Sequence, residues 1–286
     1  MNTLAFKILW RALLYPSLAF AALAFVFFWI YAHPRRYISP REPESLGLIP
    51  ERVRLSTTDG ISLDAWFIPH KISGKTVIIC HGYPMDKGDV LELTHFLARD
   101  FNLLYFDFRA TGRSGGFFST GGKREVRDID AAVAFLKSRG LAGGIGLFGF
   151  SMGAATVLLS ENPAIKARAA DAPYADLAQE MAHIFRGFGI WRKPLLAAMK
   201  AWSLVLMGVN INSISPARSA AGLTTPVLLI QGDADTQVPP ENAFKIKAAS
   251  PSAELWLIKG AGHGETREAA GLQYEERIAA FFAKNL

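Results

Sequence analysis

One serine lies between two glycines in the stretch Gly149-Phe150-Ser151-Met152-Gly153, after an apolar run and before a small-residue helical pattern. Glycines two residues to either side suit a sharp turn at which a strand and a helix approach closely. Such a turn exposes the Ser151 hydroxyl at the N-terminus of a helix, whose free N–H groups favour negative charge. The pattern predicts a nucleophilic serine. The alternative is a glycine-rich helix cap in which Ser151 is only the N-cap.

A serine hydroxyl is a weak nucleophile unless a base accepts its proton. Among the six histidines, His263 combines a position after the last strand-like run with a short glycine-rich loop, so we expect it to be the base. The carboxylate that orients this base is expected in GDADTQVP, where Asp235 is favoured because it lies further into the loop. Asp233 and Asp171 remain alternatives. The chain order Ser151, Asp235, His263 is one of the known triad orders.

An acyl-transfer site also needs donors for the negative oxygen that forms during attack. The backbone N–H of Met152 is one expected donor, and that of Tyr83 in the loop CHGYPMD is the other. His81 in the same loop is expected to hold the loop in shape. HExxH and paired-cysteine motifs do not occur, so the sequence predicts no metal site and no cofactor.

Short apolar runs alternate with helical patterns along most of the chain. A hairpin is expected around Asp59-Gly60, and helices near 87–99, 123–139, 152–160, 241–249 and 268–284. The further strand-like runs are TVIICHG, FNLLYFDF, GIGLFGF, KARAADA, PVLLIQG and ELWLIKG. Nearly continuous apolar strands separated by helices predict an α/β fold, with a mostly parallel central sheet and helices on both faces.

The segment between Ala172 and Pro226 is much longer than a plain crossover between two parallel strands requires. We expect a helical lid insertion at about 172–225. From Met181 to Gly232 the sequence has no acidic residue. Such a basic, apolar insertion suits contact with anionic lipid, or equally an ordinary lid whose apolar face packs on the core. Its basic residues are Arg186, Arg192, Lys193, Lys200 and Arg218.

An uncharged stretch from Ala12 to Ala32 is long enough to cross a membrane as a helix. A cleaved signal peptide is the less favoured alternative, because Trp29 and Tyr31 lie where a cleavage site needs small residues. We therefore expect a membrane anchor at 1–33, a linker at 34–50 and one catalytic domain at 51–286. The protein is expected to be a single-pass membrane protein. Basic residues slightly favour a cytoplasmic catalytic domain and leave the side of the membrane open.

Composition excludes several other classes of protein. The 286 residues are half hydrophobic, with a net charge of +6, and they are enough for one large domain. A single cysteine, Cys80, excludes an intrachain disulfide and is expected in the core. Neither a basic run nor a known binding module is present, so nucleic acid is not an expected partner.

Five motifs in this order resemble the α/β-hydrolase superfamily over about residues 50–286: HGYP, DFRATGRSGG, GFSMG, GDADTQVP and GAGH. Within that superfamily the chain is similar to membrane-anchored Bem46/ABHD13-like serine hydrolases. The resemblance implies an eight-stranded, mostly parallel sheet and hydrolysis of esters or related acyl compounds. It also implies the roles given above to the serine, aspartate, histidine and two N–H donors. Two departures from the family pattern are Ala110, where glycine is usual, and Tyr83-Pro84 in the oxyanion loop.

The sequence therefore predicts a membrane-anchored serine hydrolase that cleaves carboxylic ester or thioester bonds of apolar acyl substrates through an acyl-enzyme. Its expected partners are a small-molecule acyl ester or thioester, and membrane lipid through the N-terminal helix and the basic lid. An aminopeptidase-like amide hydrolase is one alternative. Its ammonium-binding carboxylate is poorly provided, since only Asp176 and Glu180 lie near the start of the insertion. A non-catalytic, lipid-binding scaffold on the same fold is the other.

Overall fold

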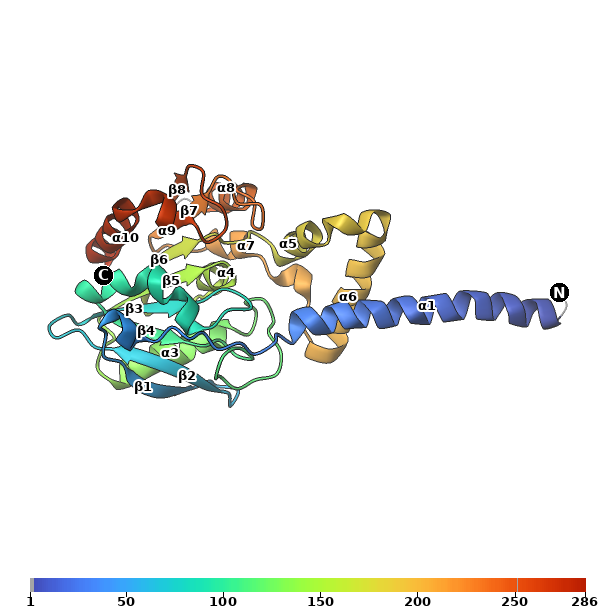
Figure 1. Ribbon diagram of the computed structural model, residues 1–286, viewed down its shortest axis with the longest axis horizontal. Coiled ribbons are helices and arrows are strands. Elements are labelled where there is room, and N and C mark those ends of the chain that lie inside the picture. Colours follow the sequence, from blue (N-terminus) through green and yellow to red (C-terminus); the bar gives the residue numbers. More distant parts are fainter. Residues whose placement is uncertain (1–2, 251) are drawn as a thin grey trace.

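The computed structural model describes residues 3–250 and 252–286, which contain one eight-stranded sheet in the order β1-β2-β4-β3-β5-β6-β7-β8 (Figure 1). The hairpin predicted around Asp59-Gly60 joins β1 (Glu51–Ser56) to β2 (Ser62–Ile68), and β2 also pairs antiparallel with β4. All the other pairings are parallel, which confirms the predicted α/β architecture. The remaining strands are β3 (Lys75–Cys80), β4 (Asn102–Phe106), β5 (Gly144–Phe150), β6 (Ile165–Asp171), β7 (Val227–Gly232) and β8 (Ala253–Ile258).

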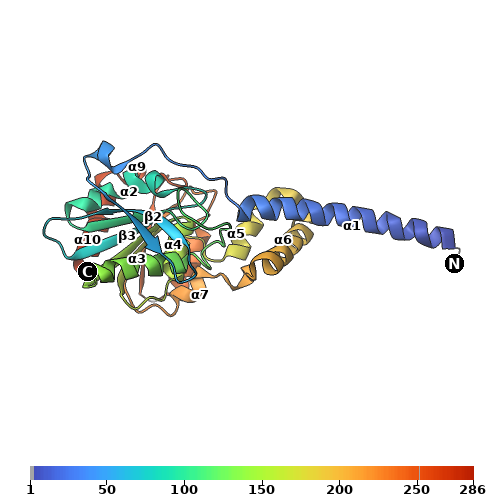
Figure 2. The same cartoon turned by 90° about the horizontal axis from the view of Figure 1, so that it is seen from below.

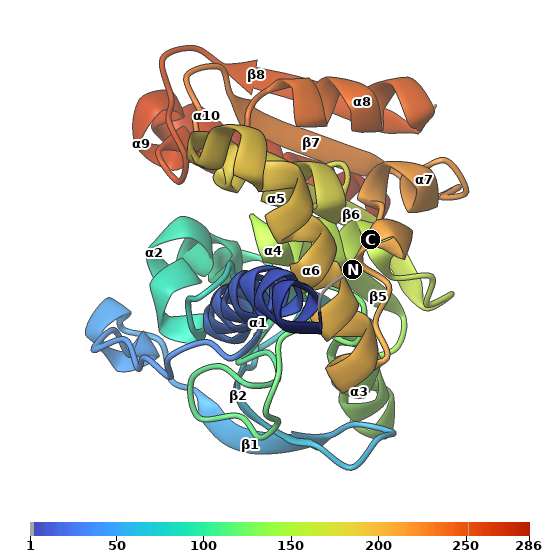
Figure 3. The ribbon, with the colours of Figure 1, turned by 90° about the vertical axis from the view of Figure 1, so that its right-hand side faces the viewer.

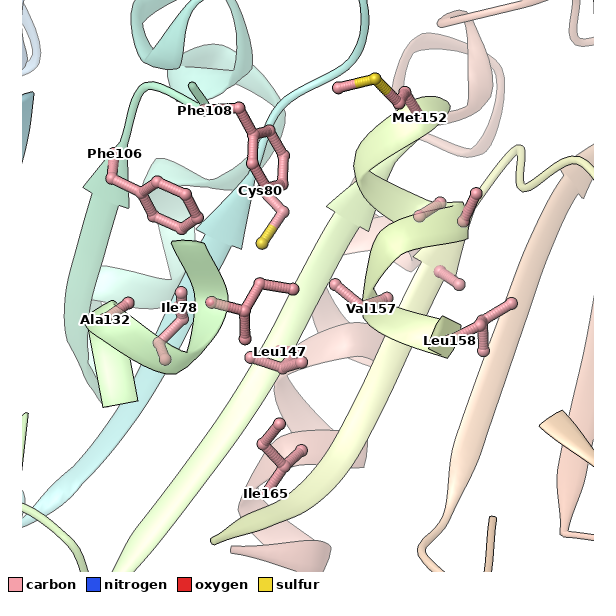
Figure 4. Packing of buried hydrophobic residues seen from close by; sticks show 14 of the residues in the cluster. Ile78, Cys80, Phe106, Phe108, Ala132, Leu147, Met152, Val157, Leu158 and Ile165 are labelled. Atoms are coloured by element: carbon pink, nitrogen blue, oxygen red, sulfur yellow. The ribbon is translucent and has the colours of Figure 1, made fainter. Parts of the chain in front are cut away.

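The central strands β3 to β7 are buried along almost their whole length because both faces of the sheet are covered. On β3, Ile78 and Cys80 belong to the cluster that packs against α3 (Val126–Ser138) and α4 (Met152–Leu159). The alternate residues Val77 and Ile79 belong to the cluster on the other face, with α10 (Leu272–Asn285). Figure 4 shows Cys80 among apolar neighbours, as expected for a core residue.

Two helices predicted as continuous are interrupted in the structure. The segment near 87–99 consists of η2 (Lys87–Val90), α2 (Leu91–Thr94) and η3 (His95–Arg99). The C-terminal segment divides into α9 (Thr266–Ala270) and α10 at Gly271, whose φ of 57° leaves the helical region. α8 (Glu241–Ala249) has the predicted bounds.

The N-terminal helix α1 (Thr3–Ala32) projects away from the sheet (Figures 1 and 2). Its segment Phe6–Ala32 has a mean hydropathy of 2.1 and is long enough to cross a membrane, although a signal sequence would meet the same criteria. The following residues contain the short helix η1 (Pro43–Leu46) and lead into β1.

The insertion between β6 and β7 is helical, as predicted from its length and patterning. Its largest helix, α6 (Arg192–Met207), packs against α1, and the Trp202 indole Nε1–H donates to the carbonyl oxygen of Ala21 at 3.2 Å. Part of its apolar surface is therefore covered by α1. Its helices are α5 (Leu177–Ile184), η4 (Arg186–Trp191), α6 (Arg192–Met207), η5 (Ile211–Ser213) and α7 (Pro216–Ala220).

Candidate active site

Ser151 lies at the junction of β5 and α4 in a backbone conformation that is rare for a residue with a side chain, with φ 53° and ψ −115°. Its N–H donates to the carbonyl oxygen of Asp171 at 2.8 Å, which fixes the turn to the neighbouring strand. A Cβ on Gly149 would lie 2.4 Å from the carbonyl oxygen of Gly153, and one on Gly153 would lie 2.2 Å from that of Cys80. A side chain at either position would collide with the backbone, so both positions require glycine.

The three side chains predicted from sequence form a hydrogen-bonded chain. His263 Nε2 lies 3.1 Å from Ser151 Oγ, and His263 Nδ1 lies 2.8 Å from Asp235 Oδ2. The other carboxylate oxygen of Asp235 accepts the backbone N–H groups of Gln237 and Val238 at 2.9 and 2.8 Å. The carboxylate is thus held in place, and it can fix the tautomer of the imidazole so that Nε2 faces the serine.

Neither alternative carboxylate hydrogen-bonds to His263 among the described residues. Asp233 Oδ1 accepts the N–H of Gly260 at 2.6 Å and braces the two loops that follow β7 and β8. Asp171 accepts the hydroxyl groups of Thr266 and Tyr274 at 2.6 and 2.8 Å, and burial raises its pKa to about 6. The geometry therefore favours Asp235.

The loop after β3 is shaped by His81, as expected. The buried imidazole accepts the N–H of Phe108 at Nε2 and donates from Nδ1 to the carbonyl oxygen of Gly82, at 2.9 and 2.6 Å. Burial lowers the pKa of His81, which favours the neutral form that both contacts need. Tyr83 and Met152 line the same cavity as Ser151. Within the described part of the chain, neither backbone N–H group donates a hydrogen bond.

Ser151 and His263 open into a cavity of about 460 Å³. Two parts of the chain that lie far apart in sequence, α1 and the insertion, contribute to its walls, together with the loops that follow β3, β4 and β7. Figure 3, seen from the N-terminal side, shows α1, α5 and α6 together in front of the strands. The apolar lining includes Phe28, Tyr31, Met181, Met199 and Met207. Such a cavity can hold an apolar group beside the nucleophile.

Glu180, one of the two acidic residues expected near the start of the insertion, is a cavity residue. Its side chain lines the cavity on α5 and is 7% exposed, and its Oε2 has no hydrogen-bond partner within residues 3–250 and 252–286. Burial raises its pKa to about 7. A buried carboxyl without a partner is costly unless a ligand supplies one. No motif marks Glu180, so only its position identifies it.

The sheet topology, the sharp turn at Ser151 and the hydrogen-bonded Ser-His-Asp arrangement together define an α/β hydrolase of the serine type. Residues 90–286 match the prolyl oligopeptidase family, known as Peptidase S9. The match covers more than half of the chain, and the protein belongs to this family.

Individual relatives agree with this class. The chain is 28% identical to the uncharacterised protein YqkD of Bacillus subtilis, over 78% of this chain and 75% of that one. It is also 28% identical to the α/β-hydrolase domain-containing protein WAV2 of Arabidopsis thaliana, over 86% and 82%. Among solved structures, an esterase from Pyrococcus furiosus is similar with 30% identity and a TM-score of 0.74, covering 89% of this chain and 98% of that chain.

Proposed function

We propose that this protein is a membrane-anchored serine hydrolase that cleaves carboxylic ester or thioester bonds of apolar acyl substrates. The observation that carries the proposal is the apolar cavity that reaches Ser151 and His263. The similar esterase from Pyrococcus furiosus supports ester chemistry. The apolar helix α1 and the resemblance to membrane-anchored Bem46/ABHD13-like hydrolases support the anchor.

The reaction follows from the hydrogen-bonded chain of side chains. Ser151 Oγ attacks the substrate carbonyl carbon while His263 Nε2 accepts its proton, and Asp235 stabilises the imidazolium. The N–H groups of Tyr83 and Met152 bind the oxyanion. His263 then gives the proton to the leaving alcohol or thiol, which departs as the acyl-enzyme forms. A water molecule releases the acyl group as a carboxylic acid by the same route.

The test uses the full-length protein in detergent micelles. A fluorophosphonate probe is expected to label the wild type, and a series of acyl esters and thioesters is expected to give turnover. Ser151→Ala should abolish labelling and reduce kcat/KM by at least ~10⁴, because the nucleophile is lost. A wild type that neither labels nor hydrolyses any ester or thioester would leave the non-catalytic lipid-binding scaffold as the better interpretation.

Hydrolysis of amino-acyl substrates is a second candidate, favoured by Glu180. Its buried carboxyl lines the cavity that holds the nucleophile and can accept a hydrogen bond from a substrate ammonium group. The prolyl oligopeptidase family assignment is also compatible with amide hydrolysis. Amino-acyl anilides, compared with their N-acetylated forms, test this candidate. A preference for the free amine that Glu180→Gln removes would support it, whereas equal rates would oppose it.

A further inference from the structure

We propose that the C-terminal end of α1 is a wall of the substrate-binding site that sets which acyl chains fit, so that the helix does more than tether the enzyme. This inference rests on the proposed ester hydrolysis. The ligand that it concerns is the acyl chain of the substrate. Phe28, Tyr31 and Ala32 all line the cavity that contains Ser151 and His263.

The exposure of α1 changes along its length. Trp10 and Leu18 are each 57% exposed, whereas Phe28 is 4% and Ala32 is 5% exposed. The last turns are therefore packed into the protein, although the helix as a whole projects from it (Figure 2). Phe28 belongs to an apolar cluster with Leu195 and Met199 of α6. One face of this end of the helix thus has the burial of a core element, while Ile30 on the remaining surface is 56% exposed.

Hydrogen bonds fix this end to the loops that frame the nucleophile. The Tyr83 hydroxyl donates to the carbonyl oxygen of Tyr31 at 2.9 Å, and the N–H of Ser119 donates to that of Ala32 at 2.8 Å. Tyr83 is also the residue whose backbone N–H we propose as an oxyanion donor. The wall formed by α1 is therefore held in a defined position relative to the reacting atoms, as chain-length selection requires.

The side chain at position 28 should control the length of acyl group that the cavity accepts. Removing the phenyl ring leaves space that additional methylene groups can fill, and each buried methylene strengthens binding about fourfold. Enlarging the ring takes space away. Binding differences of this size change kcat/KM by factors of about 10 or more for a few carbons.

The experiment measures kcat/KM of the full-length protein in detergent micelles for a series of esters whose acyl chains have about two to sixteen carbons. Phe28→Ala is expected to move the optimum to longer chains by at least about two carbons, and Phe28→Trp to shorter chains. Leu23→Ala is the matched control, because Leu23 lies on the same helix, is 48% exposed and does not line the cavity. Its profile should equal that of the wild type.

Unchanged profiles in both Phe28 variants, with normal turnover, would overturn the inference and leave the proposed function intact. If Phe28→Ala fails to fold, Phe28→Leu and Phe28→Trp provide the same comparison. Rates of labelling by fluorophosphonates of different alkyl length give a second readout that needs no ester turnover. Absence of both labelling and turnover in the wild type would instead reject the hydrolase proposal itself, and the inference with it.

Discussion

Backbone strain in this protein is concentrated at residues that follow sheet strands. Within residues 3–250 and 252–286, three residues with side chains have positive φ angles: Ser151 at 53°, Ala172 at 55° and Ala110 at 63°. Ser151 and Ala172 directly follow β5 and β6, and Ala110 lies in the turn after β4. Such conformations cost about 1–3 kcal/mol each and persist where surrounding contacts enforce them. At Ala110 the φ of 63° is a conformation that glycine adopts more easily than alanine.

Glu180 gives a pH-dependent prediction at the same scale. Its pKa rises from 4.5 in the unfolded chain to about 7 in the folded protein, because burial disfavours the charged form. The folded state therefore binds the proton more tightly, so stability falls as the pH rises through this range. Relative to wild type, Glu180→Gln should be more stable by about 3 kcal/mol at pH 8, with a much smaller difference at pH 4.

Urea unfolding of detergent-solubilised protein at the two pH values measures this difference. Glu92→Gln is a suitable control, because the Glu92 side chain is 60% exposed and its removal should have little effect at either pH. A Glu180→Gln difference that is the same at pH 4 and pH 8 would contradict the argument.

At the scale of elements, a buried ionic cluster joins β4 to the segment after β3. Asp107 accepts hydrogen bonds from Lys87 Nζ and from the backbone N–H of Arg113, both at 2.8 Å. Lys87 Nζ also forms an ion pair with Asp64 at 2.7 Å. Gly112 lies so close that a Cβ there would be 2.3 Å from Asp107 Oδ2. The carboxylate thus organises the DFRATGRSGG turn, which packs beside the loop of His81.

Asp107→Asn should lower the free energy of unfolding by about 3 kcal/mol, since the buried Lys87 ammonium loses one of its two carboxylate partners. The exposed pair of Arg52 and Glu44 provides the comparison, because Glu44→Gln should cost less than about 0.5 kcal/mol. Urea unfolding of both variants measures the contrast. Equal losses in the two variants would show that burial does not govern the strength of these pairs.

At the scale of the whole molecule, α1 and the insertion form one apolar region at the end of the molecule away from β1 (Figure 1). One side of α6 packs on α1, while Ile190, Trp191 and Val205 of the insertion remain exposed. The basic residues of the insertion, from Arg186 to Arg218, belong to the same part of the chain as these exposed apolar residues. The structure therefore shows packing for one side of the insertion, and lipid contact of the exposed apolar side chains stays a prediction.

We expect the full-length protein to stay in the membrane fraction after carbonate extraction, with residues before Ala32 retained. The physical reason is the length and hydropathy of Phe6–Ala32, together with the packing of its last turns against the catalytic domain. N-terminal sequencing of the purified protein measures this. A mature chain that begins after Ala32 would identify the segment as a signal sequence.

Features that local patterns encode could be predicted from the amino-acid sequence. Apolar runs specified the sheet, and the glycines around Ser151 specified the turn that exposes its hydroxyl. Because parallel strands end at one edge of a sheet, loop residues such as Asp235 and His263 could be expected to meet there.

Features that depend on contacts between distant segments became visible only in the folded chain. Folding brought α1 to the cavity, placed the unmarked Glu180 there and interrupted the C-terminal helix at Gly271. The hydropathy of α1 indicates that the helix is removed from water. Burial in a membrane and burial in a protein interior both meet this condition. The end of α1 differs from its exposed beginning because it packs against α6 and the Tyr83 loop. The periodicity of the sequence does not predict this packing.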